Sequence, residues 1–380
     1  MVGYLTFLTI STAIFALFSL GLNLQWGFTG LINFGHVAFM TLGAYATVLL
    51  SDMGVPLPLA VLCGALLAAI LGIGVGTATL RLREDYLAIV TIGVSETIRL
   101  VALNEEWLTR GAFGVQGFPL PLGGFRPNAI GKGTCILVLS LVFAAGAWYL
   151  WRWIRTVKPI NAIAGGIIGY GFGGLIYVTG VLALLDYRYK AGLMLVAVVT
   201  LAIIYAALEW LTASPWGRVL KAIREDEEIP RALGKNVFWY KLQAFMLGGA
   251  IAGIAGAFYA WQLTTVYPVN FIPLISFYAW TIVALGGAGN NAGVVLGAVI
   301  FWGYESLTRF VLPGLRRALE ALPLADGSVL QGPVDGVTWF LDDARLGAFR
   351  IMVIGAILMT LMIWRPQGIL GRKEELTLGR

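Results

Sequence analysis

Long apolar runs separated by short polar segments make up most of this chain. Eleven runs are close to the roughly 20 residues that a helix needs to cross the hydrocarbon core of a membrane. Only helices satisfy their backbone groups within a single segment in lipid, so the pattern predicts an all-α integral membrane protein, a polytopic bundle of about 10–11 transmembrane helices. The predicted spans cover residues 4–22, 30–50, 57–79, 86–103, 134–153, 160–185, 191–212, 242–261, 271–288, 292–312 and 346–364.

Two of these runs contain residues that interrupt helices. The run 30–50 begins with Gly30, and the run 271–288 contains Pro273 close to its start. Membrane helices that are interrupted in this way border cavities or binding sites, where protein or water satisfies the freed backbone groups. We therefore expect both segments to be broken or re-entrant.

The basic residues between the spans predict an orientation. Alternate loops carry 15 Lys and Arg residues on one side of the predicted bundle and 8 on the other. Because cytoplasmic loops are enriched in basic residues, the N-terminus is expected outside and the C-terminus inside. The residues 214–241 then form a cytoplasmic loop, while 104–133 and 313–345 lie outside, the latter as a solvated loop or a surface helix. Residues 1–380 are expected to form a single transmembrane domain.

Composition supports the membrane assignment. Apolar residues account for 59% of the chain and charged residues for 12%, and the mean hydropathy is +0.84. A soluble domain carries about a quarter charged residues, so this chain cannot cover a soluble surface. The net charge of +6 is spread over loops between spans, which is the pattern of membrane orientation and not that of a nucleic-acid partner.

The 49 glycines predict helix contacts. Small residues four positions apart let helices approach closely in lipid, as at Gly249 and Gly253 or Gly293 and Gly297. No glycine segment has the spacing of a nucleotide-binding P-loop. One histidine cannot build a metal site, and no catalytic constellation is evident, so catalysis by this chain is not expected.

A few polar residues fall inside the predicted spans. Glu96 and Arg99 are three residues apart, so they share one face of a helix and can form an ion pair. The pair either locks the bundle internally or lines the translocation path, since charges inside a membrane avoid lipid. The simpler interpretation is the internal pair. Asn33 and His36 also have two interpretations. The preferred one is a hydrogen-bonded structural histidine, and the other is a role in lining the path.

The segment after the seventh run predicts a short pair of helices. Ser214 can cap a helix whose first turn contains Pro215, and apolar residues then recur at helical spacing on one face. Pro230 interrupts the pattern and Gly234 is typical of a helix end. The pair is either a plain interfacial helix or a docking surface for a soluble partner.

Here the sequence resembles the permease subunits of branched-chain or neutral amino-acid ABC importers, of the LivM type. Five blocks carry the resemblance, and the fifth is the weakest: residues 21–36, residues 80–91 continuing to 96–99, the segment 214–236, Arg-Pro-Gln-Gly at 365–368, and residues 283–289. The resemblance implies an ABC importer permease fold in the bacterial plasma (inner) membrane.

The resemblance also implies a role for the 214–241 loop. In such importers this loop couples the permease to ATPase subunits, and the positions that match the pattern are Arg218, Ala222, Arg224, Glu225, Asp226, Ala232 and Gly234. Further implied partners are a second, related permease, a substrate-binding protein outside, and a small neutral amino acid as substrate. ATP and Mg would bind the ATPase, with no cofactor on this chain. Pro230, the insert 162–185 and the segment 313–345 depart from the family pattern.

Two other classes of function remain as alternatives. A secondary transporter of small neutral solutes, driven by an ion gradient, needs protonatable or ion-binding groups near the membrane midplane. Only Glu96, Arg99 and His36 are candidates for such groups. A membrane enzyme is more remote, because it needs a reactive constellation.

Overall fold

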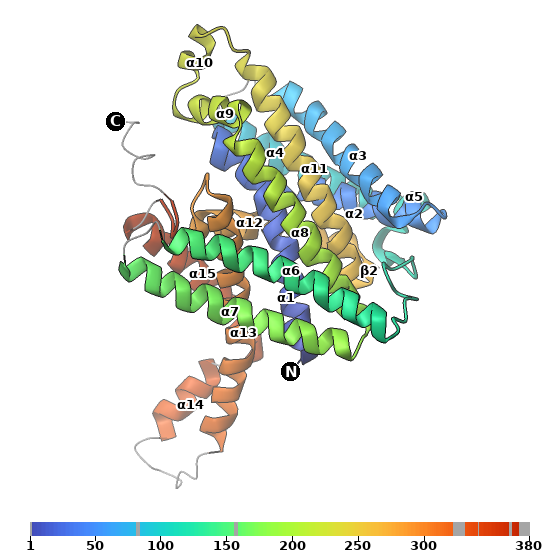
Figure 1. Cartoon of the computed structure of the whole chain (residues 1–380), viewed down its shortest axis with the longest axis vertical. Helices are drawn as coiled ribbons and strands as arrows, with labels where there is room; N and C mark the ends of the chain where they lie inside the picture. Colours follow the sequence, from blue (N-terminus) through green and yellow to red (C-terminus); the bar gives the residue numbers. More distant parts are fainter. Residues whose placement is uncertain are drawn as a thin grey trace.

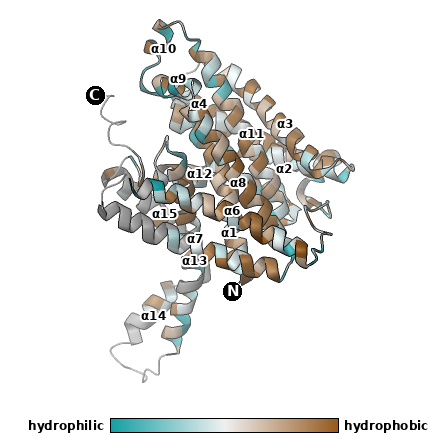
Figure 2. Ribbon diagram, in the orientation of Figure 1, coloured by the Kyte–Doolittle hydropathy of each residue, from teal (hydrophilic) through white to brown (hydrophobic). Residues whose placement is uncertain are grey.

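The computed structural model describes residues 2–80, 84–155, 159–321, 331–340, 342–364 and 367–371, and every structural statement below concerns these residues. They form a bundle of long helices that run side by side (Figure 1). Hydrophobic residues cover most of the long helices, and hydrophilic residues gather in the short helices α9 (Pro215–Glu225) and α10 (Glu228–Ala232) (Figure 2). The predicted all-α, multi-pass membrane fold is confirmed.

Each of the eleven predicted runs corresponds to a helix. In the described residues, eight helical segments are long and apolar enough to cross a membrane, and α2 and residues Gly173–Leu185 of α7 form shorter apolar helices. The eleven helices are α1 (Val2–Leu22), α2 (Val37–Asp52), α3 (Leu57–Thr79), α4 (Glu84–Asn104), α6 (Ala129–Ile154), α7 (Pro159–Leu185), α8 (Tyr189–Ala213), α11 (Val237–Leu263), α12 (Leu274–Gly286), α13 (Asn291–Glu320) and α15 (Asp343–Trp364).

Helices α1 and α11 form the centre of the bundle. Helix α1 packs against α8, α11 and α13, and α11 also packs against α2 and α3. Glycines make these crossings close: a Cβ atom on Gly43 would overlap the carbonyl of Gly253, and one on Gly21 would lie 2.5 Å from the carbonyl oxygen of Gly248. The helix contact predicted at Gly253 is therefore confirmed, and it rests on backbone-to-backbone approach.

Both predicted interruptions are present. Helix α1 continues into a π-helical stretch, η1 (Asn23–Gly27), and residues 30–36 form no regular helix before α2 begins at Val37. Helix α12 is likewise preceded by a short strand β2 (Thr265–Val266) and a 3-10 turn η3 (Pro268–Phe271). Two spans therefore bring irregular backbone into the bundle.

The segment 104–133 folds back onto β2. It contains the short helix α5 (Glu106–Thr109), the 3-10 turn η2 (Gly111–Phe113) and the strand β1 (Val115–Gln116). Strand β1 pairs antiparallel with β2, with Val115 opposite Val266. This pairing holds the segment against the broken approach to α12.

The segment 313–345, predicted as a solvated loop or a surface helix, is largely helical over its described residues. Helix α13, predicted to end at residue 312, continues through Pro313 to Glu320, and α14 (Gln331–Phe340) and the start of α15 follow. Arg316 stabilises this extension, since its guanidinium bonds Glu320 at 2.7 Å and Asp342 at 3.0 Å. One proline removes a single backbone donor, and the helix here continues past it.

The ends of the bundle carry different features. Helices α9 and α10 lie at one end, and the start of α1 and α14 lie at the opposite end (Figure 1). We call the first the α9–α10 end. It also holds η1, the turn between α12 and α13, and residues 367–371, as the contacts described below show.

Candidate functional site

A buried polar network joins the broken end of α1 to three other helices. Asn23, fully buried in η1, donates through Nδ2 to Asn291 Oδ1 at 3.0 Å and accepts from the backbone N–H of Gly289 at 2.9 Å. Asn291 in turn donates to Glu209 Oε1 on α8 at 3.1 Å. Gln25 donates to the carbonyl of Phe245 on α11 at 2.9 Å. Since water is excluded here, these bonds are expensive to break and fix η1 in place.

Asn33 and His36 belong to the same network. Asn33 Nδ2 donates to Gln25 Oε1 at 2.8 Å and lies 3.5 Å from His36 Nδ1. His36 is fully buried, its ring lies on Phe18 with centroids 4.7 Å apart, and Nε2 is 3.1 Å from the carbonyl oxygen of Phe18. A neutral ring with its proton assigned to Nε2 satisfies both contacts. The geometry gives His36 a structural position.

Sequence reasoning missed Asn23, Gln25, Asn291 and Glu209. Glu209 lies inside the predicted span 191–212, and a charged residue within a span is a signal of a functional position. This signal could have identified Glu209 from the sequence. Asn23 and Gln25 lie in the block 21–36 that carries the family resemblance. Their partners are up to 268 positions away in sequence, which no local pattern indicates.

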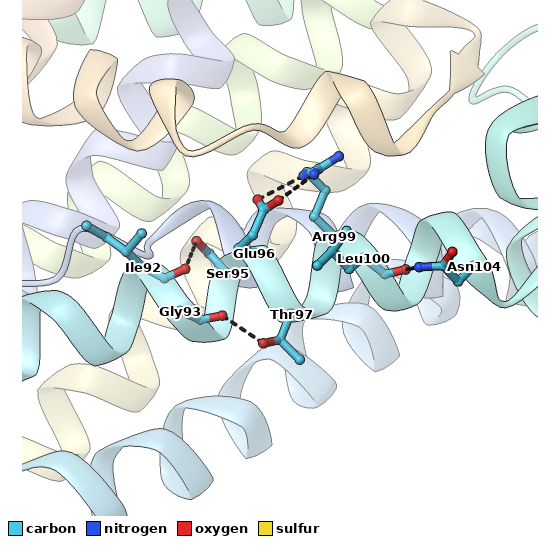
Figure 3. Close-up of polar contacts among 8 residues, drawn as sticks. All are labelled: Ile92, Gly93, Ser95, Glu96, Thr97, Arg99, Leu100 and Asn104. Atoms are coloured by element: carbon cyan, nitrogen blue, oxygen red, sulfur yellow. Dashed lines mark hydrogen bonds and ion pairs between the residues drawn. The ribbon is translucent and has the colours of Figure 1, made fainter.

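Glu96 and Arg99 form the predicted ion pair on α4. Arg99 donates through Nε to Glu96 Oε2 at 2.9 Å and through Nη2 to Oε1 (Figure 3). The other polar side chains drawn there bond to carbonyls of their own helix. The pair points away from α4 toward the segment that contains η3, against which the helix packs (Figure 3). Both side chains keep some exposure, and a charged group cannot be left against lipid.

The two helices α9 and α10 protrude from the bundle. Leu220 and Ile223 are buried, so the predicted apolar face of α9 packs inward, and the indole N–H of Trp216 donates to Gln243 Oε1 at 2.7 Å. Ser214 occupies the N-cap position and Pro215 the first turn, as predicted, but the Ser214 hydroxyl makes no capping bond and donates instead to the carbonyl of Leu211 at 2.6 Å. The preceding helix α8 ends at Ala213, directly before Ser214, and its free carbonyls compete for that hydroxyl.

Most of the positions that matched the coupling pattern are exposed. Arg218, Glu225, Asp226, Ala232 and Gly234 face outward, and Ala222 is half-buried. Arg224 differs from them, because its Nη1 donates to the carbonyl of Gly27 in η1 at 2.6 Å. The expectation that Arg224 faces a partner therefore does not fit its position, since a long arginine can reach back under its own helix.

Helix α10 presents an unusual surface. Ile229 and Leu233 are exposed at 57% and 75%, whereas Pro230 between them is buried. Gly234 ends the helix with φ of +74°, and the bonds from Gly234 N to Arg231 O and from Lys235 N to Pro230 O form a Schellman motif. The predicted helix end at Gly234 is confirmed. An ion pair between Glu227 and Lys241 ties α10 to α11.

The chain just after the block 365–368 bonds to the block 283–289 at the same end of the bundle. The backbone N–H groups of Ile369 and Leu370 donate to the carbonyls of Leu285 and Gly286, each at 3.0 Å. Asn290 Nδ2 donates to the Leu370 carbonyl at 2.9 Å. The chain after α15 therefore closes over the turn between α12 and α13, where Asn23 also binds.

Among the described residues there is no group of three or more His, Cys, Asp or Glu that could hold a metal ion. The arrangement instead consists of spans broken at two places, a buried polar network, an ion pair at membrane depth and a protruding helix pair. These features fit a transport protein of many spans, a class in which broken helices with irregular backbone border cavities and binding sites.

The comparison with protein families identifies the class. Residues 4–158 and 160–325 match the family described as "Branched-chain amino acid transport system / permease component". The match covers most of the chain, so this protein belongs to that family of ABC transporter permeases. Family membership supports a transport permease and gives no support to the ion-gradient-driven carrier.

Individual relatives agree with the family. The "High-affinity branched-chain amino acid transport system permease protein LivM" of Escherichia coli K12 is 28% identical over 360 residues, which cover 94% of this chain and 68% of the relative. A probable LivM permease of Methanocaldococcus jannaschii is 22% identical, with 94% and 91% covered. The E. coli permease LivH is 20% identical, with 95% and 92% covered. No solved structure matches this chain.

Proposed function

We propose that this chain is the translocation subunit of a binding-protein-dependent importer of branched-chain or other neutral amino acids. Separate ABC ATPase subunits bind ATP and Mg, and this chain binds no cofactor. A second, related permease completes the path and a binding protein outside delivers the substrate. The family and the printed functions of the LivM and LivH relatives support this assignment. This chain is similar to both LivM and LivH, which supports a transporter built from two related permeases.

The proposal places the chain in a bacterial plasma (inner) membrane, with its N-terminus outside and its C-terminus inside. The excess of basic residues in the loops of the α9–α10 end supports this orientation. Single cysteines at Arg188 and Lys235, in a variant without Cys63 and Cys135, test it with a membrane-impermeant maleimide on intact cells. Arg188→Cys should be labelled and Lys235→Cys protected, and the reverse pattern would contradict the orientation.

The exposed surface of α9 and α10 carries the proposal of ATPase docking. Ile229 and Leu233 project from α10 beside the exposed Ala232 and Gly234. Exposed apolar side chains on a helix that protrudes beyond the spans are typical of a binding surface. Arg218, Glu225 and Asp226 supply a charged border to this surface. Ala222, which lies between Arg218 and Glu225 on α9, is half-buried. In this proposal the surface sits in a groove of an ATPase subunit.

The path itself is proposed to follow the ion pair on α4. Glu96 and Arg99 complement the ammonium and carboxylate groups of a neutral amino acid, and both remain partly exposed in this chain. Asn33 and His36 are buried and bonded to neighbouring groups, so they would shape the path and not contact the solute.

A tryptophan at Ala232 tests the docking surface. Ala232 is exposed, so Ala232→Trp should insert at the normal level, bind the ATPase weakly and lose most uptake. Gly234→Trp is less informative, because φ of +74° strains any larger residue. Arg188→Trp is the matched control, since Arg188 is 82% exposed at the opposite end of α8. An interfacial helix without a docking role would tolerate the aromatic ring, so normal pull-down and uptake by Ala232→Trp would remove this role.

A further inference from the structure

Arg224 is the basic residue of α9 that turns inward. Arg224 is half-buried and its guanidinium donates to the Gly27 carbonyl at 2.6 Å, and the ammonium of Lys221 lies 5.6 Å from the ring centroid of Phe28. Arg218, six residues earlier on the same helix, is exposed. Helix α9 thus contacts the broken end of α1 through two neighbouring residues.

The wide turn of η1 makes the Gly27 carbonyl available. The N–H groups of Gly30 and Leu31 donate to the carbonyls of Trp26 and Gln25, at 2.9 Å and 3.0 Å. In an ordinary Schellman motif these two N–H groups would donate to the carbonyls of Gly27 and Trp26. Here each bond reaches one residue further back, so the Gly27 carbonyl is left for another donor. Carbonyls at a helix C-terminus carry partial negative charge, and a cation is favourable there. Arg224 supplies that cation from another element.

Gly27 has no room to move independently of its neighbours. A Cβ atom on Gly27 would overlap the Asn23 side-chain oxygen and lie 2.5 Å from the Gly289 nitrogen. Asn23 is itself held by Gly289 and Asn291. A displacement of Gly27 therefore shifts η1 and the start of α13 together, because close-packed interiors transmit strain.

The segment beyond Gly27 leads toward the ion pair. After Phe28 and Thr29 come residues 30–36, where Gly35 packs so closely on the Thr91 carbonyl of α4 that a Cβ atom would overlap it. Glu96 lies five residues further along that helix. A continuous set of contacts thus joins α9, η1 and the segment 30–36 to α4 at Thr91, on the helix that carries Glu96 and Arg99.

We propose that Arg224 is a positioning residue that transmits movement of α9 to the broken end of α1. The inference rests on the proposed function, in which an ATPase displaces α9 and α10. Arg224 then acts within the membrane subunit and not at the ATPase surface. Loss of the Arg224 side chain leaves ATPase docking and ATP hydrolysis intact but uncouples them from solute transport.

The test uses the whole complex in liposomes: this chain, its partner permease, the ATPase subunits and the binding protein. Arg224→Gln removes the cation, and Arg188→Gln is the exposed control. We expect Arg224→Gln to bind the ATPase subunits as the wild type does and the complex to hydrolyse ATP at the wild-type rate. The amount of amino acid imported per ATP should fall about tenfold, as for the loss of one charge-assisted hydrogen bond. Arg224→Lys, which keeps a donor and a charge, should give an intermediate ratio.

Three outcomes are distinguishable. Weakened ATPase pull-down by Arg224→Gln would make Arg224 a docking residue and overturn the inference. An unchanged ratio of import to hydrolysis would also overturn it, and if Arg224→Gln fails to insert, the ratio of Arg224→Lys decides in the same way. A wild-type complex that imports nothing with ATP would instead contradict the proposed function.

Discussion

Arg99 binds both carboxylate oxygens of Glu96, one turn earlier on α4. The side chain of Glu96 remains 37% exposed in this chain and that of Arg99 18% exposed. A charged pair at membrane depth must face protein or water, because contact with hydrocarbon is expensive. We therefore expect water or another subunit to cover the exposed side of the pair, and substitutions on α4 can separate a structural role from a role in transport.

Neutral substitutions of the pair test these roles. Glu96→Gln or Arg99→Gln alone leaves one charge without its partner, so stability should fall, though by less than the roughly 3–5 kcal/mol of a fully buried pair. The double substitution should restore insertion and thermal stability. If the pair lines the path, uptake by the double variant stays low, and we expect about a tenth of the wild-type rate or less, the loss that follows from one missing charged contact.

Membrane expression and uptake are measured together on these three variants. Thr97→Val is a suitable control, because Thr97 is an exposed polar residue of the same helix and, among the described residues, its hydroxyl bonds only to the Gly93 carbonyl. Recovery of both folding and uptake by the double variant would show that the pair merely locks the bundle.

The buried network predicts a large effect at Asn23. Asn23→Leu leaves the Gly289 N–H and the Asn291 side-chain oxygen without their Asn23 partner, at a cost of about 1–3 kcal/mol for each group left unpaired. Thr47→Val is the matched control, since the buried hydroxyl of Thr47 has no hydrogen-bond partner among the described residues. Thermal unfolding in detergent should therefore show a clear loss for Asn23→Leu and little change for Thr47→Val. Equal behaviour of the two variants would argue against the network.

Backbone contact between α2 and α11 gives a third prediction. Gly43→Ala forces a methyl group into the Gly253 carbonyl, so the two helices must separate and the yield of monodisperse protein should fall. Gly74→Ala on α3 meets open space and should be tolerated. Size-exclusion profiles and melting temperatures of the two variants provide the measurement. A normal profile for Gly43→Ala would show that this crossing is looser than described.

The sequence was sufficient to predict the spans and the two interruptions, because hydropathy, Gly and Pro act locally. The pair of Glu96 and Arg99 was predictable for the same reason, since its members are three residues apart. The partner of Asn23 and the inward direction of Arg224 were not, because both depend on how distant helices pack. The continuation of α13 past Pro313 depends in part on Asp342, which α15 brings to Arg316.

The central claim is that this permease moves an amino acid only when ATP is hydrolysed by a partner. Purified chain in liposomes should hydrolyse no ATP and accumulate no radiolabelled leucine under an imposed proton or sodium gradient. Adding the second permease, the ATPase subunits and the binding protein should then give ATP-dependent accumulation that persists when ionophores collapse every gradient. Gradient-driven accumulation of leucine by the chain alone would contradict the account.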